Sequence, residues 1–266
     1  MDIVIVGPGR AGGALGIAAS EAGHRVVAVA GRDPHRTEAL AERLGAAPRR
    51  LDAPLGPAEL LVLAVRDDAI RPVAAAVDAS GIPAAVHLSG ARPVVDLEPL
   101  ADRGVAVGVF HPLQTLPDPE TGAAALAGAW AAITAVDPLA DVLEGLARDL
   151  GMRPFHLADD HRVLYHAGAA AAANAVVAAL AVAARLFARA EVPFVAARPL
   201  VETVVANAFD LGPARALTGP VARGDVATVR AQLAAVAEGA PETVPAFAAL
   251  VEAVAVVAGR SPEEFR

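Results

Sequence analysis

The sequence contains no cysteine and no lysine among its 266 residues, and its aromatic residues are only seven Phe, one Tyr and one Trp. The absence of cysteine excludes disulfide bonds, thiolate metal sites and a catalytic thiol. With so few aromatic rings, a groove that stacks nucleobases is not expected. The formal net charge is −8 and the arginines form no long basic run, which also argues against nucleic acid as a partner.

The sequence also lacks the features of an exported or membrane protein. It opens with the strand-like run Asp2–Val6, without a basic segment or a small-residue cleavage site, so we expect no signal peptide. The stretch Ala167–Ala184 has nearly the length of a membrane span, but it is mostly alanine, contains Asn174 and follows His161 and Arg162. We therefore predict a buried core helix there, no membrane contact and a cytoplasmic location.

The hydrophobic pattern divides the chain into two parts. Up to about residue 155, short apolar runs alternate with amphipathic stretches, as in βα units around a largely parallel sheet. Beyond that point only helical patterns rich in alanine, valine and leucine remain. We predict a doubly wound α/β Rossmann domain over residues 1–158 and an all-helical domain over residues 159–266. The expected strands are Ile3–Val6, Arg25–Ala30, Leu60–Val65, Ala84–Leu88, Val105–Phe110, Ala131–Val136 and Pro154–Leu157; the expected helices are Ala11–Ala22, Pro34–Leu44, Ala69–Ala79, Val94–Asp102, Leu139–Leu150, Asp160–Ala190, Arg198–Leu211, Val226–Ala237 and Val244–Ala258.

A glycine fingerprint follows the first expected strand. Residues 2–16 read DIVIVGPGRAGGALG, which gives GxGxxG at Gly7, Gly9 and Gly12. Gly7 permits the tight turn, Gly9 lets the backbone approach a pyrophosphate, and Gly12 allows close helix–strand packing. The helix that starts beside Arg10 directs its free N–H groups at the phosphates. Because the motif joins a strand to a helix, it predicts a dinucleotide site rather than only a glycine-rich turn.

Cofactor preference is encoded at the end of the second expected strand, about 20 residues past the last fingerprint glycine. An acidic residue there holds the ribose hydroxyls of NAD, whereas this sequence has Arg32. We expect Arg32 to pair with a 2′-phosphate, with His35 or Arg36 as a second contact. Asp33 could contact a ribose, but its position before Pro34 is explained by an N-cap role. The pattern favours NADP, with NAD possible.

The third expected strand runs into LAVRDDAI, which places Val65, Arg66 and Asp67 at the carboxyl edge where ligands bind in such sheets. We expect these three residues to contact the cofactor ribose. The alternative is that Asp67 or Asp68 only caps the next helix.

Two more strands end in polar residues at the same expected edge. The segment HLSG contains Ser89, and FHPLQT contains His111, Gln114 and Thr115. Because strand ends in an open α/β sheet face the cofactor crevice, these residues are candidate contacts of the substrate or the nicotinamide amide. A lone histidine at a strand end also has a structural interpretation.

The long alanine-rich helix supplies the catalytic candidates. A spacing of four places His166, Ala170 and Asn174 on one face, with Arg162 one turn earlier. Histidine titrates near neutrality, so His166 could protonate a developing alkoxide or amine. Asn174 is costly to bury unless it is bonded, which predicts a ligand or a buried partner. The alternative is that both residues only bond to the Rossmann domain.

Near the C-terminus, LTGPVARGD combines a turn-rich loop with Arg223 and Asp225. Asp225 is the expected N-cap of the helix from Val226. Arg223 could clamp a substrate carboxylate, reach across a dimer interface, or simply be solvated.

Taken together, GPGRAGGALG, VRDDAI, HLSG, FHPLQT, YHAGAAAAAN and LTGPVARGD resemble the bacterial Rossmann-like oxidoreductases that carry a C-terminal domain of unknown function. The resemblance covers almost the whole chain. It implies an NAD(P)-linked fold related to ketopantoate reductase, pyrroline-5-carboxylate reductase and prephenate dehydrogenase, with a C-terminal domain like that of 6-phosphogluconate dehydrogenase. It supplies a class of enzyme but no substrate.

One departure from the related enzymes matters for mechanism. Ketopantoate reductases and β-hydroxyacid dehydrogenases use a lysine four residues before an asparagine on this helix. Asn174 matches the asparagine, but the lysine position is Ala170, and no lysine exists elsewhere in the chain. A proton donor must come from another residue, for which His166 is the candidate.

The first hypothesis is an NADP-dependent reductase of a small carbonyl compound, with a ketopantoate-like keto acid as the leading guess and a cyclic imine as the alternative. The second is a dinucleotide-binding sensor that has lost catalysis. Alanine-lined helices usually need a partner surface, so we also predict a homodimer through the C-terminal domain.

Overall fold

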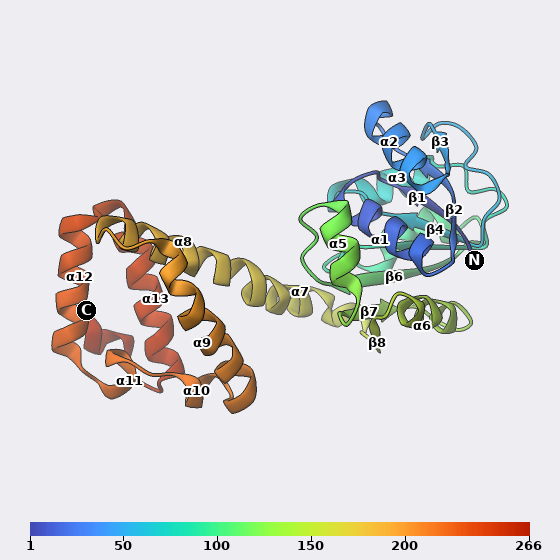
Figure 1. Ribbon diagram of the computed structural model, residues 1–266. Helices are drawn as coiled ribbons and strands as arrows, with labels where there is room; N and C mark the ends of the chain where they lie inside the picture. The colour runs from blue at the N-terminus through green and yellow to red at the C-terminus, as the bar shows by residue number, and fades with distance from the viewer. The chain divides into compact units, whose positions relative to one another are not determined.

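The computed structural model describes all residues from Met1 to Arg266. By its internal packing the chain divides into two compact units, Met1–Ala170 and Ala171–Arg266. Figure 1 shows a sheet flanked by helices in the first unit and only helices in the second. The division predicted at residues 158/159 stays a prediction about where the two domains separate.

The first unit is built on one eight-stranded sheet with the order β3-β2-β1-β4-β5-β6-β7-β8. All neighbouring strands are parallel except β6 and β7, which are antiparallel. The chain moves outward from β1 in both directions, so the carboxyl ends of β1 and β4 form the switch point at which such sheets bind ligands. The strands are β1 Asp2–Val6, β2 Arg25–Ala30, β3 Ala47–Arg49, β4 Leu60–Leu63, β5 Ala84–His87, β6 Ala106–Leu113, β7 Trp130–Thr134 and β8 Arg153–His156.

Continuous apolar runs explain the central strands. Residues 3–6 of β1 and 60–63 of β4 are all fully buried, as expected for parallel strands that are covered on both faces. Their side chains point alternately into two separate clusters, one on each side of the sheet. The rigid middle of the sheet therefore fixes the loops at its carboxyl edge.

Helices cover both faces of this sheet. Sequence signals set their ends: Asp33 caps α2 by accepting a hydrogen bond from the backbone N–H of Arg36 at 3.2 Å, and Gly45 ends that helix in a left-handed conformation. The helices of the first unit are α1 Arg10–Glu21, α2 Pro34–Leu44, α3 Ile70–Ala76, α4 Glu98–Ala101, α5 Pro119–Leu126, α6 Leu139–Asp149 and α7 Arg162–Ala170; the short 3-10 helices are η1 Asp67–Ala69, η2 Val94–Leu97 and η3 Asp159–His161.

The second unit is entirely helical and has a small core. Its fully packed cluster consists of Val221, Val229, Val251, Ala255 and Phe265. Its elements are the π-helical turn η4 Ala171–Ala175, then α8 Val176–Arg189, η5 Phe194–Ala197, α9 Arg198–Leu211, α10 Pro213–Ala216, α11 Pro220–Arg223, α12 Val226–Gly239, η6 Pro241–Thr243, α13 Val244–Val257 and η7 Pro262–Phe265.

The predicted fold class is confirmed: an α/β Rossmann domain with a mainly parallel sheet precedes an all-helical region. In the first unit β3 and α5 escaped the sequence analysis, and in the second unit the short helices α10 and α11 did as well. The strand β3 is only three residues long and contains Pro48. The segment that leads into α5 shows no apolar periodicity. The predicted N-cap Asp225 is also observed, because its carboxylate accepts from the backbone N–H of Thr228 at 3.1 Å.

The prediction of a buried core helix at Ala167–Ala184 was wrong. The helix Asp159–Arg189 is long and apolar enough to cross a membrane by length and composition, with a mean hydropathy of 1.9, yet only 6% of its most apolar window is buried. Nothing in its own chain covers most of its alanine and valine side chains. One such helix is weak evidence for a membrane span.

Candidate functional site

The glycine fingerprint forms the tight turn between β1 and α1. Gly7 has a φ of +112°, and a Cβ there would lie 2.3 Å from the carbonyl oxygen of Ala64. A Cβ on Gly12 would lie 2.2 Å from the carbonyl oxygen of Gly7, so close packing requires glycine at both positions. Gly9 is different, because a Cβ there would meet no atom within 4 Å. The space in front of Gly9 is therefore open for a ligand.

The N-terminus of α1 adjoins that open space. Gly9 caps the helix without a side-chain hydrogen bond, and the first turn contains no acidic residue. Arg10, the first helical residue, is exposed. The unpaired N–H groups and the positive end of the helix dipole favour an anion such as a diphosphate.

A cavity of about 500 Å³ begins at this turn. Its walls include Gly7 and Gly9 on one side, Arg32 and Arg36 on another, and Val65 with Arg66 on a third. These residues come from the ends of β1, β2 and β4, which are adjacent strands. Five of the predicted dinucleotide residues therefore line a single space, which fits a dinucleotide with its phosphates against α1, whereas Arg10, Gly12 and Asp67 do not line it.

The loop after β2 is basic and exposed. Arg32 makes no ion pair within the chain and lines the cavity. Asp33, the acidic alternative, also lines the cavity, but its carboxylate caps α2 and lies 3.4 Å from the guanidinium of Arg36, so both of its oxygens already contact Arg36. His35 is exposed and does not line the cavity.

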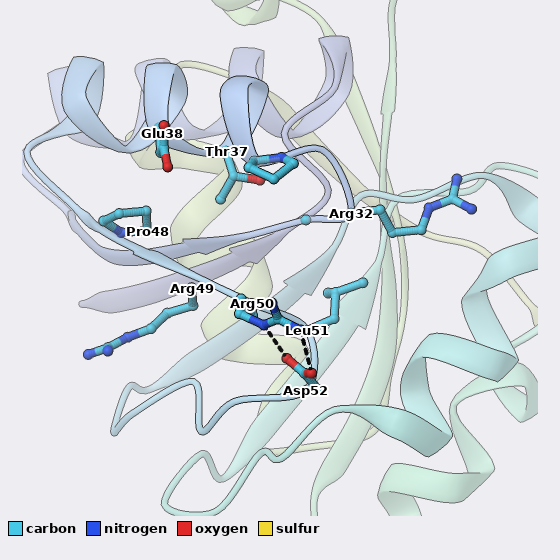
Figure 2. A pocket seen from close by; sticks show the side chains of 10 residues that line it. Arg32, Thr37, Glu38, Pro48, Arg49, Arg50, Leu51 and Asp52 are labelled. Carbon is cyan, nitrogen blue, oxygen red and sulfur yellow. Dashed lines mark hydrogen bonds and ion pairs between the residues drawn. The ribbon is translucent and has the colours of Figure 1, made fainter.

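A second cavity, of about 460 Å³, shares Gly31 and Arg32 with the first. Figure 2 shows that Arg32 and Arg49 point in opposite directions from its rim. Arg50 pairs with Asp52 through two hydrogen bonds of 2.9 and 2.8 Å. Arg32 is therefore the one arginine that lines both this cavity and the cavity beside the glycine turn.

The end of β4 resolves an alternative that the sequence left open. Neither Asp67 nor Asp68 caps the helix, because η1 begins after Arg66 without a side-chain cap. Asp68 instead pairs with Arg66 at 3.2 and 3.0 Å, and Asp67 is exposed without a hydrogen-bond partner. Val65 and Arg66 line the cavity, whereas Asp67 does not.

A third cavity, of about 400 Å³, continues the site toward β6. Arg10, Val65 and Arg66 line it from the cofactor side, and His111 with Gln114 line it from the end of β6. Because Val65 and Arg66 belong to both cavities, the cofactor space and the space beside His111 are neighbours.

The other predicted substrate contacts hold the loops instead. The Ser89 hydroxyl accepts from the backbone N–H groups of Ala91 and Arg92 at 3.2 and 3.1 Å. Gln114 accepts from the backbone N–H of Thr115 at 2.8 Å and donates to the carbonyl of Ala125 at 3.2 Å. Ser89 and Thr115 do not line the cavity beside His111.

A buried arginine ties α7 to this loop. Arg162 is fully buried, and its guanidinium donates to the carbonyls of Ser89 and Arg92 at 2.9 and 3.0 Å and to the Thr134 hydroxyl at 2.7 Å. Burial lowers its pKa, and the nearby Asp159 carboxylate opposes that shift. Arg162 therefore places a fixed cation beneath the ends of β5 and β7.

Two imidazoles lie near that cation, the fully buried His87 and the half-buried His111. Burial lowers the pKa of His87 to about 4, and its ring lies between the carbonyl of Pro93 at 3.3 Å and the backbone N–H of Ser89 at 3.2 Å. Burial first, and then the positive charge of Arg162, lower the pKa of His111 to about 4 as well. Both imidazoles are neutral at pH 7.

His111 is the centre of a polar cluster with α7. Its Nδ1 lies 2.7 Å from the Tyr165 hydroxyl, and its ring centroid lies 6.2 Å from that of His166. A Cβ on Gly90 would approach His166 to 2.6 Å and the Nε2 of His111 to 2.7 Å. Gly90 therefore leaves the room in which the two imidazoles sit together.

Aromatic rings continue from this cluster to the surface. Tyr165 makes an edge contact with Phe155 at 6.0 Å between ring centroids, and Phe155 makes another with Trp130 at 6.0 Å. Burial raises the pKa of Tyr165 to about 12, so its hydroxyl stays protonated. The only tyrosine and the only tryptophan of the chain thus belong to one row.

The remaining predicted residues lie in the second unit. Asn174 is exposed within the π-helical turn η4, and its side chain makes no hydrogen bond, contrary to the expected buried partner. A π-helical turn also interrupts the four-residue spacing that we used to group it with His166. Arg223 is exposed at the end of α11. The functional roles of both residues stay predictions.

Sequence reasoning missed Tyr165, and it used Arg162 only as a spacing marker. Both contacts depend on α7 meeting β5, β6 and β7, which no local pattern reveals. A signal was present in the sequence, because the only tyrosine of the chain directly precedes His166 in an otherwise alanine-rich helix.

Family models match both parts of the chain. A Rossmann-like domain matches residues 1–112, and a domain of unknown function (DUF2520) matches residues 129–254. The two matches and their order agree with the family that the motifs resemble, in which a Rossmann-like domain precedes this C-terminal domain. No curated protein matches the chain.

Solved structures share the fold over nearly the whole chain. An NADP oxidoreductase from Bacteroides fragilis is 23% identical, with a TM-score of 0.81 and coverage of 96% of this chain and 98% of that one. An imine reductase from Streptomyces aurantiacus is 18% identical, with a TM-score of 0.67 and coverage of 100% and 98%. A reductive aminase from Aspergillus terreus, in complex with cyclohexanone and allyl amine, is 18% identical, with a TM-score of 0.72 and coverage of 99% and 97%.

Proposed function

We propose that this protein is an NADP-dependent oxidoreductase that reduces a small carbonyl compound or the corresponding imine. The main observation in support is the open space in front of Gly9. The N-terminus of α1 faces this space, and the space continues past Val65 and Arg66 to His111. The similar structures of an NADP oxidoreductase and an imine reductase support the same class of reaction.

Each part of the site has a task in this proposal. NADPH, when bound, supplies the hydride. The backbone at Gly7, Gly9 and Arg10 binds its diphosphate, and Val65 and Arg66 contact the neighbouring ribose. His166 is exposed beside His111, so it can return a proton from solvent to the reduced oxygen or nitrogen. Asn174 is proposed to orient the substrate and Arg223 to bind a substrate carboxylate.

The preference for NADP over NAD rests on Arg32. Replacing it by alanine (Arg32→Ala) should weaken NADPH binding by roughly tenfold or more and NADH binding only slightly, because a guanidinium pairs with the 2′-phosphate alone. Calorimetric titration of both nucleotides measures this. Arg49→Ala is the matched control, since Arg49 lies on the same rim but points away from Arg32. Equal losses for both nucleotides would contradict the assignment.

The substrate class has two candidates. A ketopantoate-like keto acid follows from the sequence and would place its carboxylate near an arginine. A cyclic imine is favoured by the likeness to an imine reductase and to a reductive aminase bound to cyclohexanone. A panel of 2-keto acids and cyclic imines, followed by the loss of NADPH absorbance, separates the two. No turnover of either group would contradict the proposed reaction.

A sensor that binds NADP without catalysis is the alternative, favoured by the absence of lysine at Ala170. His166→Ala distinguishes the two functions. For a reductase, turnover should fall by roughly 10²-fold or more with the NADPH dissociation constant unchanged. For a sensor, wild type and variant would bind NADPH equally and neither would reduce any substrate.

We also propose that the protein is a soluble, cytoplasmic homodimer that buries the second unit's apolar surface against a second copy. Phe209 is 87% exposed and Leu200 is 63% exposed on α9, beyond the helix of membrane-span length. Glu202 and Asp210 lie among these apolar residues, and buried lipid contact would make such carboxylates costly. A protein partner with polar groups at the rim suits this mixture better. Sedimentation at micromolar concentration tests it, and a monomer would contradict it.

A further inference from the structure

The Tyr165 hydroxyl is the only side-chain group that bonds to His111. It lies 2.7 Å from Nδ1, on the edge of the imidazole turned toward α7. The opposite nitrogen, Nε2, lies over Gly90 and makes no hydrogen bond within the chain. His111 also lines the cavity that adjoins the cofactor space. One nitrogen is therefore held by the protein, and the other has no hydrogen-bond partner within the chain.

The pKa shifts set the charge of the pair, and the direction of the hydrogen bond between them sets which nitrogen of His111 carries the proton. Burial raises the pKa of Tyr165 to about 12, so the phenol keeps its proton and can donate it. Burial, Arg162, His166 and His87 all lower the pKa of His111, which is therefore neutral. A neutral imidazole that accepts at Nδ1 must carry its hydrogen on Nε2. The ring then offers an N–H donor without a positive charge.

We propose that Tyr165 is a positioning residue that holds His111 with its Nε2–H directed at the oxygen or nitrogen of the bond being reduced. The Tyr165 hydroxyl donates to Nδ1, and the Nε2–H of His111 donates to the substrate. A neutral imidazole that polarises a carbonyl in this way assists hydride addition, because negative charge develops on the same atom. His166 then provides the proton, so the two imidazoles have separate tasks.

This inference rests on the proposed reduction, but its first test does not need turnover. In the wild-type protein labelled with ¹⁵N, the ring nitrogens of His111, assigned with His111→Gln, should show Nε2 protonated and Nδ1 as a hydrogen-bond acceptor at pH 7. In Tyr165→Phe the Nδ1 resonance should shift, because the acceptor loses its donor. A proton on Nδ1 in the wild type would overturn the proposal.

The kinetic test separates positioning from packing. Tyr165→Phe keeps the aromatic ring and removes only the hydroxyl, so kcat should fall by roughly tenfold while the NADPH dissociation constant stays within a factor of two. Phe155→Leu is the matched control: it alters the ring that packs on Tyr165 and leaves the hydroxyl, so kcat should remain near the wild-type value. An equal fall in both variants would overturn the positioning role.

Turnover by the wild type decides which proposal has failed. If the wild type reduces substrate and Tyr165→Phe matches it, the positioning role is wrong and the proposed function stands. If the wild type binds NADPH and reduces nothing in the panel, the proposed reaction is wrong, whatever the tautomer of His111.

Discussion

The two units of this chain differ in how much of their apolar surface they bury. The first unit buries its own: Ile3, Phe110 and Leu143 are completely inaccessible, and two clusters fill both sides of the sheet. The second unit has one small cluster and leaves Leu200 and Phe209 largely exposed. Burial of apolar surface is the main source of folding stability. The first unit therefore gains more of its stability from its own core than the second unit does.

The predicted functional residues of the two units also differ in whether hydrogen bonds hold their side chains. In the first unit, Arg162 and Tyr165 near His111 are held by hydrogen bonds, and only the exposed His166 beside it has none. The predicted residues of the second unit, Asn174 and Arg223, are exposed and make no side-chain hydrogen bond. The groups held by hydrogen bonds thus belong to the first unit, and the predicted residues without such bonds belong to the second.

The largest effect is expected from Gly12→Ala in the first unit. The added methyl group would meet the carbonyl oxygen of Gly7 at 2.2 Å, so the unfolding free energy should fall by about 3 kcal/mol in urea titrations. Gly9→Ala is the control: its methyl group enters open space, so stability should stay unchanged while NADPH binding weakens. Equal destabilisation by both changes would contradict the distinction between a packing and a binding glycine.

A pH dependence should follow from the neutral imidazoles of the first unit. The pKa values of His87 and His111 are about 4, against 6.5 in an unfolded chain. Between these values the unfolded chain binds more protons, so stability is fully present above pH 6.5 and is lost as the pH falls toward 4. Each histidine should contribute a slope of about 1.4 kcal/mol per pH unit. Urea unfolding from pH 7 to 4 measures it, and an unchanged slope in His111→Gln would contradict it.

In the second unit, Phe209→Asp should change association rather than folding. A carboxylate at a side chain that is 87% exposed costs little in the monomer, but it would be buried in a dimer, so the dimer dissociation constant should rise by roughly tenfold or more. Val136→Asp is the control in the first unit, where that valine is 80% exposed. Sedimentation velocity should report dissociation for the first variant only; the same shift in both would remove α9 from the interface.

The smallest expected effect is a gain in stability. Gly145 lies within α6, and a Cβ there would meet nothing within 4 Å. Gly145→Ala should raise the unfolding free energy by about 0.5–1 kcal/mol, because alanine loses less backbone entropy in a helix. Thermal and urea unfolding measure the gain, while sedimentation should stay unchanged. A loss of stability would contradict the open space that a Cβ on Gly145 is expected to enter.

Much of the fold and the cofactor residues could be predicted because they depend on local rules. The fingerprint glycines are required by the turn itself, and the caps Asp33 and Asp225 are set by the residues that follow them. Buried parallel strands such as β1 and β4 are continuous apolar runs. These features lie within a few residues of the signals that reveal them.

The rest depends on contacts between distant segments. Tyr165 reaches His111 from 54 positions away, and Arg162 bonds to Ser89 from 73 positions away, so neither contact has a signature in its own segment. The burial predicted for the alanine-rich helix was wrong for the same reason. Composition indicates that such a helix prefers to be covered, but not whether its own chain provides the cover.

The row of rings that ends at Trp130 gives the protein a built-in optical reporter. Each chain carries one indole, and the edge contacts through Phe155 and Tyr165 connect it to the imidazole beside the proposed reaction centre. Its emission therefore comes from a single known position. Changes around Trp130 can be followed by intrinsic fluorescence, without a label and without competing signal from a second tryptophan.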